Sequence, residues 1–245
     1  MDLTKEVIDR IEDLVTQSMV VEVDGQKMST RDLHPATFEA VAQPLTVSSL
    51  TGFVDFVNTN IDKLDLNANY IAVVDDVDKV VLPSAIFGIR KNREILIEAI
   101  LDSRMESFPF GRFLPQEEFI IKLHSRFQKK EDDDFDYVSA LVSKIKQADS
   151  ANTEDDGITQ NITVKKGVSG ALVGKENVKP IVRLSPYRTF REIEQPESQF
   201  LLRIKTENGI PYVALFEADG GQWRNEARTA IAEFLKANIK VSVIA

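Results

Sequence analysis

The chain of 245 residues contains no cysteine, two histidines and one tryptophan. Without cysteine it cannot build a disulfide framework, a thiolate zinc site, an iron–sulfur cluster or a cysteine nucleophile. No apolar run approaches the ~18 residues of a membrane-spanning helix. The first residues also lack the basic and apolar stretches of a signal peptide. We therefore expect a cytoplasmic protein that makes no use of membrane insertion or thiol chemistry.

The few candidate catalytic and metal-binding residues form no established pattern. His34 precedes a proline in a predicted loop, and His124 lies beside a helical stripe, so a structural role is expected for both. The acidic runs at 75–78 and 132–136 lack the glycine and glutamate positions of an EF-hand. A solvated turn and a helix start explain these runs better than a cation site. We predict no enzyme activity, no cofactor and no metal site.

One segment superficially resembles a phosphate-binding loop. Residues 169–176 contain two glycines and a lysine, but Ser169 stands where that loop needs its first glycine. Glu176 stands where the loop needs a magnesium-binding hydroxyl, and its carboxylate repels a triphosphate. A glycine-bearing connection between strands is the better interpretation.

Charge divides the chain into an acidic part and a neutral part. The net charge is −9, with 27 acidic and 17 basic residues in 1–150 and 12 acidic and 13 basic residues in 151–245. Phosphate backbones repel such a chain, so direct nucleic-acid binding is disfavoured. An acidic face that imitates DNA is an alternative, although excess acid usually serves solubility.

Hydrophobic periodicity predicts an α+β fold in two parts, residues 1–150 and 151–245, with a polar linker at 149–157. The first part is expected to be helix-rich with short hairpins. Its helices are expected at 3–15, 50–61, 115–127 and 138–148, the second capped by Ser48 or Ser49. Its strands are expected on both sides of Asp24-Gly25, at 70–74 and 79–82, and at 94–101, where a short helix is an alternative.

The second part is expected to hold a mostly antiparallel sheet and one packing helix. Strands are predicted at 158–168, 180–184, 199–206, 212–217 and 240–244, and a helix at 222–238. Asn208-Gly209 predicts the turn between two of the strands. We expect Phe200, Leu202 and Ile204 to share one sheet face with Tyr212, Ala214 and Phe216.

Two interpretations fit the turn from Glu217 to Gly221. In the structural one, Asp219 caps the following helix, the glycines form the turn and Trp223 fills the core. In the functional one, the turn is the edge of a surface that binds a partner through charge-assisted contacts. The partner-binding set is then Arg183, Arg188, Arg191, Arg203, Glu217, Asp219 and Arg224. A double change of Arg188 and Arg191 to glutamate is expected to weaken association and to leave the fold intact, on the premise that both are exposed.

Five segments resemble uncharacterised proteins of temperate phages and prophages, and more distantly the YfdQ-type phage family. They are Phe108–Phe113 followed by Glu118–Ile120, Pro186–Phe190, Glu194–Ser198 and Ala214–Trp223. The similarity runs in order from the hairpin near Val20 to the C-terminus. It implies a phage origin and expression in the cytoplasm of the host cell. The shared motifs carry no known chemistry and transfer no active-site residue.

Together these features predict a phage-encoded, non-enzymatic and oligomeric binding protein. Its expected partner is a host or phage protein, in host takeover or inhibition of host defence. An accessory role in phage DNA replication or recombination is the first alternative, and a nucleotide-sequestering module is the second.

Overall fold

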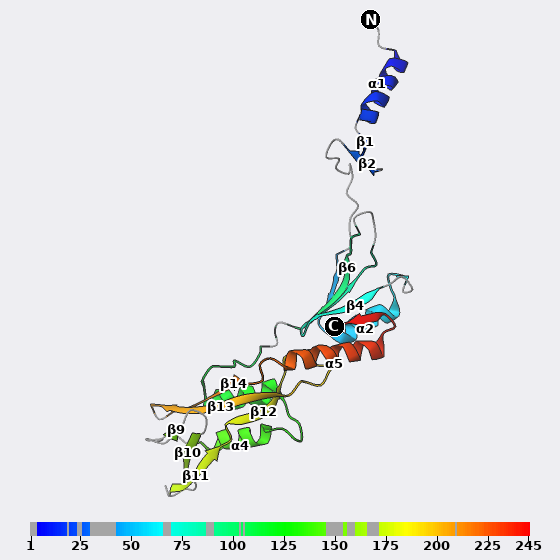
Figure 1. Ribbon diagram of the computed structural model, residues 1–245. Coiled ribbons are helices and arrows are strands. Elements are labelled where there is room, and N and C mark those ends of the chain that lie inside the picture. Colours follow the sequence, from blue (N-terminus) through cyan, green and yellow to red (C-terminus); the bar gives the residue numbers. More distant parts are fainter. Residues whose placement is uncertain are drawn as a thin grey trace. The chain divides into compact units, whose positions relative to one another are not determined.

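The computed structural model describes residues 4–18, 20–23, 26–29, 43–65, 70–86, 91–102, 104, 106–145, 154–155, 160–165, 172–208 and 210–245. The chain divides into two compact units, Met1–Ala42 and Gln43–Ala245. The described residues form five helices, two five-stranded sheets and two smaller sheets (Figure 1). Helices predominate towards the N-terminus and strands towards the C-terminus, which confirms the α+β prediction.

The first unit contains one helix and one hairpin. Helix α1 spans Lys5–Ser18, and strands β1 (Val20–Val23) and β2 (Gln26–Ser29) pair antiparallel, with Val23 opposite Gln26. Both the predicted helix and the predicted hairpin are confirmed. The Asp24-Gly25 turn and His34 lie outside the described residues.

In the second unit, the first sheet has the order β15-β4-β5-β6-β3. Its three central strands pair antiparallel, and the two outer strands pair parallel to their neighbours. The strands are β3 (Leu45–Val47), β4 (Ile71–Asp76), β5 (Lys79–Pro83), β6 (Ile95–Ile100) and β15 (Ser242–Ile244). The ambiguous segment 94–101 is therefore a strand, as preferred.

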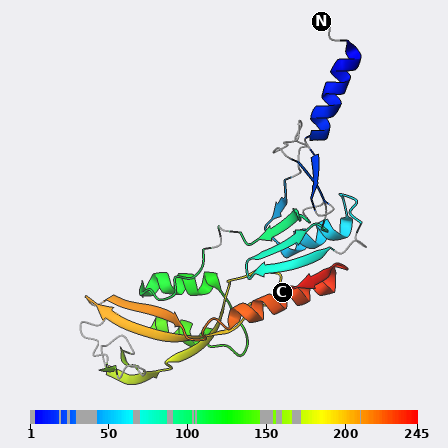
Figure 2. The ribbon, with the colours of Figure 1, turned by 45° about the horizontal axis from the view of Figure 1, so that its top comes forward.

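Helices α2 (Leu50–Thr59) and α5 (Trp223–Asn238) pack against this sheet (Figures 1 and 2). The Ser49 hydroxyl accepts the Gly52 N–H at 3.1 Å, which confirms the predicted cap and satisfies a free donor of the first turn. Burial alternates along β4 and β5, so every second residue enters the core. Phe190 and Ile193 from the connection 187–197 complete this core.

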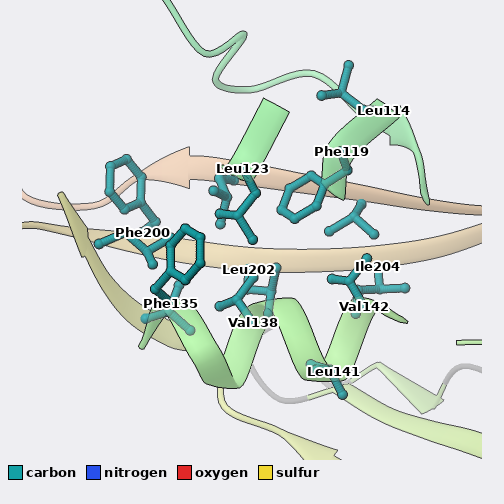
Figure 3. Close-up of a cluster of buried hydrophobic side chains, with 14 of the residues drawn as sticks. Leu114, Phe119, Leu123, Phe135, Val138, Leu141, Val142, Phe200, Leu202 and Ile204 are labelled. Atoms are coloured by element: carbon teal, nitrogen blue, oxygen red, sulfur yellow. The ribbon is translucent and has the colours of Figure 1, made fainter. Parts of the chain in front are cut away.

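The second sheet has the order β7-β14-β13-β12-β8 and is antiparallel throughout. Its strands are β7 (Leu114–Pro115), β8 (Phe127–Gln128), β12 (Ile181–Pro186), β13 (Ser198–Glu207) and β14 (Ile210–Glu217). Helices α3 (Gln116–Arg126) and α4 (Phe135–Lys144) cover one face. Figure 3 shows Phe119 and Leu123 of α3 and Val138 of α4 among the buried side chains of β13.

The register of β13 and β14 corrects the predicted composition of the sheet faces. Glu207 pairs with Ile210 across the Asn208-Gly209 turn, so Leu202 lies opposite Leu215 and Ile204 opposite Val213. These residues face α3 and α4. Tyr212, Ala214 and Phe216 therefore lie on the other face, with Leu201, Arg203 and Lys205. The prediction was wrong by one residue, and a one-residue slip moves every side chain to the opposite face.

Both five-stranded sheets contain strands from before and after residue 150. The compositional break at 149–157 therefore does not coincide with a break between the sheets. Strand β9 (Glu154–Asp155) lies within that segment, and it forms a three-stranded sheet with β10 (Gln160–Lys165) and β11 (Leu172–Val178). Residues 172–176 thus belong to a strand rather than to a loop before a helix. In the described part of the chain, no helix combines the length and apolar character needed to cross a bilayer.

Candidate binding site around Arg188 and Trp223

The turn between β14 and α5 positions the first part of the site. Gly220 and Gly221 have φ angles of +64° and +83°, a region that residues with a side chain rarely adopt. The Asp219 Oδ1 accepts the Gly221 N–H at 3.0 Å. Gln222 precedes α5 and makes no side-chain cap. The prediction that Asp219 caps the helix was therefore wrong, because its carboxylate fixes the turn before the helix.

Trp223 opens α5 and is buried, in contact with Val77 and Ala227, as the structural interpretation predicted. The guanidinium carbon of Arg188 lies 4.0 Å from the centroid of its ring. The guanidinium carbon of Arg224 lies 4.9 Å from the same centroid. The ring therefore makes cation–π contacts with two positive charges.

Arg188 is the most enclosed charge of the site, with a side chain only 6% exposed. Its Nη1 donates to Glu217 Oε1 at 2.6 Å, and its Nη2 donates to the Ser198 hydroxyl. Its Nε is buried and has no hydrogen-bond partner. The premise that Arg188 is exposed was therefore wrong. A charge reversal here leaves a carboxylate buried beside Glu217, so the fold is not expected to tolerate it.

Burial and neighbouring charges shift two pKa values at the site. Burial lowers the pKa of Arg188 to about 10, and the carboxylates of Glu217 and Asp219 act in the opposite direction. The guanidinium thus stays protonated at neutral pH. Burial acts to raise the pKa of Asp219, but hydrogen bonds from Ser198 and the Gly221 N–H and the charge of Arg188 lower it overall.

A cavity of about 390 Å³ opens beside these residues, a size within the range of known ligand sites. We call it the Trp223 cavity. Its aromatic lining consists of Phe110, Tyr187 and Trp223, and its charged lining consists of Asp76, Asp78, Arg188, Glu217 and Arg224. Asp78 and Arg224 are exposed and carry opposite charges. A second cavity of about 440 Å³ is mainly polar and is lined by Ser198, Asp219 and Glu226 among others.

Four of the seven predicted site residues meet at this place, namely Arg188, Glu217, Asp219 and Arg224. The other three lie apart. Arg183 contacts Glu197 at 3.4 Å and the Asp132 carbonyl at 2.6 Å, and Arg203 lies on the sheet face opposite α3 and α4. Arg191 does not line the cavity, but its guanidinium carbon lies 4.1 Å from the ring centroid of Tyr187, which does.

Sequence reasoning missed Asp76, Asp78, Phe110 and Tyr187 as members of this site. Phe110 and Tyr187 belong to the motifs Phe108–Phe113 and Pro186–Phe190, but nothing in the sequence indicates that these two motifs lie close together in space. The β4–β5 turn reaches the site through a long-range contact, since the Thr189 hydroxyl donates to the Val77 carbonyl. The only local signal was the acidic character of that turn.

The acidic runs and His124 have structural partners. Asp76 accepts the Val77 N–H at 2.8 Å and contacts Arg228 at 3.1 Å, and the first of these hydrogen bonds contributes most to lowering the pKa of Asp76. His124 Nε2 lies 3.0 Å from the Ser139 hydroxyl, as expected for a structural histidine. No group of three or more metal-ligating side chains that could hold an ion occurs within the described residues.

Comparison of the chain with protein-family models, with curated proteins and with solved structures gave no match. The resemblance to phage proteins consequently stays a prediction. The geometry around Arg188 and Trp223 is the basis on which a function can be argued.

Proposed function

We propose that the protein is a phage-encoded, non-enzymatic binding protein that acts on a host or phage protein in the host cytoplasm. In this proposal the partner inserts side chains into the Trp223 cavity. The observation that carries it is the combination, in one preformed cavity, of three aromatic rings with exposed charges of both signs. The phage origin and a role in host takeover or inhibition of defence rest on the sequence resemblance alone.

The residue types favour a protein partner. Tryptophan, tyrosine and arginine are the residues most enriched where a few side chains dominate binding between proteins. Trp223, Tyr187 and Arg188 meet this description, and each is held by neighbours rather than free in solvent. Because these side chains are already ordered, this protein loses less conformational entropy when a partner binds.

Charge at the mouth of the cavity sets the chemistry of the partner. Asp78 and Arg224 are both exposed and line the same cavity. A partner segment that carries one basic and one acidic side chain around an apolar residue is complementary to this arrangement. Reversal of either charge should weaken the complex without unfolding the protein.

The proposal is tested by purifying the tagged full chain from phage-infected cells together with the molecules bound to it. Proteins and extracted nucleotides are identified by mass spectrometry. Arg224→Glu and Asp78→Lys should each lower the recovery of the partner at least about tenfold. Lys236→Glu on α5 and Asp75→Lys on β4 make the same charge changes outside the cavity and should leave recovery unchanged.

Trp223 supplies a second measurement, because it is the only tryptophan of the chain. Purified partner should change its fluorescence emission in the wild type and in Lys236→Glu, but not in Arg224→Glu. Equal capture by all four variants would contradict the proposal. Recovery of nucleotides in place of a protein would favour the nucleotide-sequestering alternative.

A second candidate, an accessory of phage DNA metabolism, is favoured by the sheet face opposite α3 and α4. There the Lys205 ammonium lies 4.4 Å from the Phe113 ring centroid, and Phe113 contacts Phe216 edge to face at 6.1 Å. Half-buried aromatic rings beside basic residues are the components on which single-stranded bases stack. Fluorescence anisotropy with labelled single-stranded DNA decides this candidate. Binding that is lost in Phe216→Ala and Lys205→Glu, and kept in Arg224→Glu, would support it.

A further inference from the structure

The Trp223 cavity holds more negative than positive charge. Its charged lining consists of three carboxylates and two guanidinium groups, namely Asp76, Asp78, Glu217, Arg188 and Arg224. The chain as a whole carries a net charge of −9. Long-range attraction therefore favours a basic partner, and a side chain that enters the cavity meets a negative environment.

Contacts inside the protein already offset two of these charges. The carboxylate of Asp76 contacts Arg228 at 3.1 Å. The guanidinium of Arg188 donates to Glu217 Oε1 at 2.6 Å and to the Ser198 hydroxyl. Asp76 and Arg188 consequently gain little from a partner of opposite charge. The charges that remain set the ligand preference of the cavity.

Asp78 carries a negative charge that the protein leaves unpaired. Its side chain is exposed, and the carboxylate has no hydrogen bond or ion pair with the residues that the structure describes. Glu217 uses Oε1 for Arg188, and its side chain is 45% exposed, so a second carboxylate oxygen is open to a further donor. Two carboxylates from different elements, the β4–β5 turn and the end of β14, thus offer acceptors to the same cavity.

The remaining positive charge, that of Arg224, is already engaged. Its guanidinium carbon lies 4.9 Å from the ring centroid of Trp223. The Val77 N–H contributes most to lowering the pKa of Asp76, and the charge of Arg224 lowers it further. Arg224 therefore interacts with a ring and with a carboxylate of this chain, whereas the described residues offer Asp78 no comparable contact.

We propose that the partner residue that enters the Trp223 cavity is an arginine, which donates to the carboxylates of Asp78 and Glu217. This inference rests on the proposed function and names the side chain through which the protein partner is anchored. The acidic side chain of the partner then faces Arg224 at the mouth of the cavity.

The shape of the guanidinium group favours arginine over lysine. A guanidinium presents five N–H donors in one plane, so it can bond carboxylates from two elements at once. It also lies well over aromatic rings, as three guanidinium groups of this chain do at 4.0, 4.1 and 4.9 Å from the ring centroids of Trp223 and Tyr187. A lysine ammonium is a compact point charge and matches this lining less well.

The single tryptophan gives the test a specific signal, because its indole N–H produces one resonance in a nitrogen–proton correlation spectrum. The probe is N-acetyl-arginine amide. N-acetyl-citrulline amide is the matched control, since it has nearly the same shape but no charge. The Trp223 resonance should shift saturably with the arginine probe, with a dissociation constant on the order of 1 mM. The citrulline probe should bind at least about fivefold more weakly.

Two variants locate the binding. Asp78→Asn removes the unpaired charge and should weaken binding of the arginine probe at least about fivefold. Asp75→Asn makes the same change at an exposed aspartate of β4 outside the cavity and should bind the probe like the wild type. The absence of a saturable shift, equal affinity for the two probes or equal behaviour of the two variants would each overturn the inference.

The inference and the proposed function can fail separately. A chain that loses its protein partner in Asp78→Lys but does not respond to the arginine probe contradicts the inference alone, because another residue then fills the cavity. A chain that binds the probe through Asp78 but captures no protein supports the guanidinium chemistry of the cavity and contradicts the proposed function alone.

Discussion

Helices α1 and α5 carry similar apolar stripes but use them differently. In α5 the stripe includes Ala227, Ile231 and Leu235, each 0% exposed. In α1 the corresponding residues are about half exposed, as Ile11 is at 50%. Amphipathic spacing thus predicts which face of a helix is apolar, but it does not say whether the same chain or another molecule covers that face.

The surroundings of the two helices explain the difference. Helix α5 lies in a unit with two five-stranded sheets, and the sheet containing β4 and β5 supplies a face to pack against. Helix α1 lies in the unit Met1–Ala42, where the described residues offer only one hairpin. A unit of this size buries too little apolar surface to stabilise itself strongly. The apolar stripe of α1 is accordingly about half exposed in the part of the unit that the structure describes.

The largest expected effect comes from placing a charge in each stripe. Ile231→Asp should lower the free energy of unfolding by at least about 4 kcal/mol, because it buries an unpaired carboxylate. Ile11→Asp should change the unfolding of the second unit by less than about 0.5 kcal/mol. Urea unfolding followed by Trp223 fluorescence measures both, since that residue lies in the second unit. A large loss of stability in Ile11→Asp would show that α1 is part of the fold.

A second contrast separates a buried from an exposed arginine within one segment. Arg188→Glu should lower the free energy of unfolding by about 3 kcal/mol or more, because it breaks the contacts with Glu217 and Ser198 and leaves like charges together. Arg191→Glu should cost less than about 1 kcal/mol, because it removes only an exposed contact with Tyr187. Comparable thermal unfolding of the two variants would contradict the burial of Arg188.

The smallest contrast concerns two aspartates at the start of α4. Asp134 accepts the Arg183 N–H at 2.8 Å and the Lys179 ammonium at 2.8 Å, and its side chain is 15% exposed. Burial acts to raise its pKa, but these contacts lower the pKa overall. Asp134→Asn should cost about 1 to 2 kcal/mol at neutral pH. Asp136→Asn, whose side chain is 74% exposed, should cost less than about 0.5 kcal/mol.

The dependence on pH follows from the sign of that shift. A carboxyl whose folded pKa lies below its unfolded value stabilises the protein above the unfolded value and loses this effect as the pH falls. The stability difference between wild type and Asp134→Asn should therefore shrink below about pH 4. Denaturant unfolding at pH 7 and pH 3 measures it, and a difference that grows at low pH would contradict the assignment.

Local signals in the sequence predicted most elements of the fold. Ser49 caps α2 as its position suggested, and Asn208 adopts the positive φ of +49° that a tight hairpin needs. The β-branched and aliphatic run at 95–100 forms a strand. Each of these features depends on a few neighbouring residues, so the sequence alone was sufficient.

Features that depend on distant residues were not predictable in this way. The register of β13 and β14 was misjudged by one residue, because periodicity fixes the alternation of a strand but not its pairing. The burial of Arg188 depends on Glu217 and Trp223, which come from the end of β14 and the start of α5. Asp78 lines the same cavity as Trp223 and Arg224, although more than half of the sequence of the second unit separates it from them. Charge and spacing therefore suggested some residues of the site, but not the buried contacts of Arg188 with Glu217 and Trp223.

Hydrogen exchange of the full chain tests the comparison of the two helices most directly. Amides of α5 should exchange slowly, because the sheet containing β4 and β5 packs against the apolar face of that helix. Amides of α1 should exchange fast, because the apolar face of that helix is about half exposed. Exchange in α1 as slow as exchange in α5 would contradict the account.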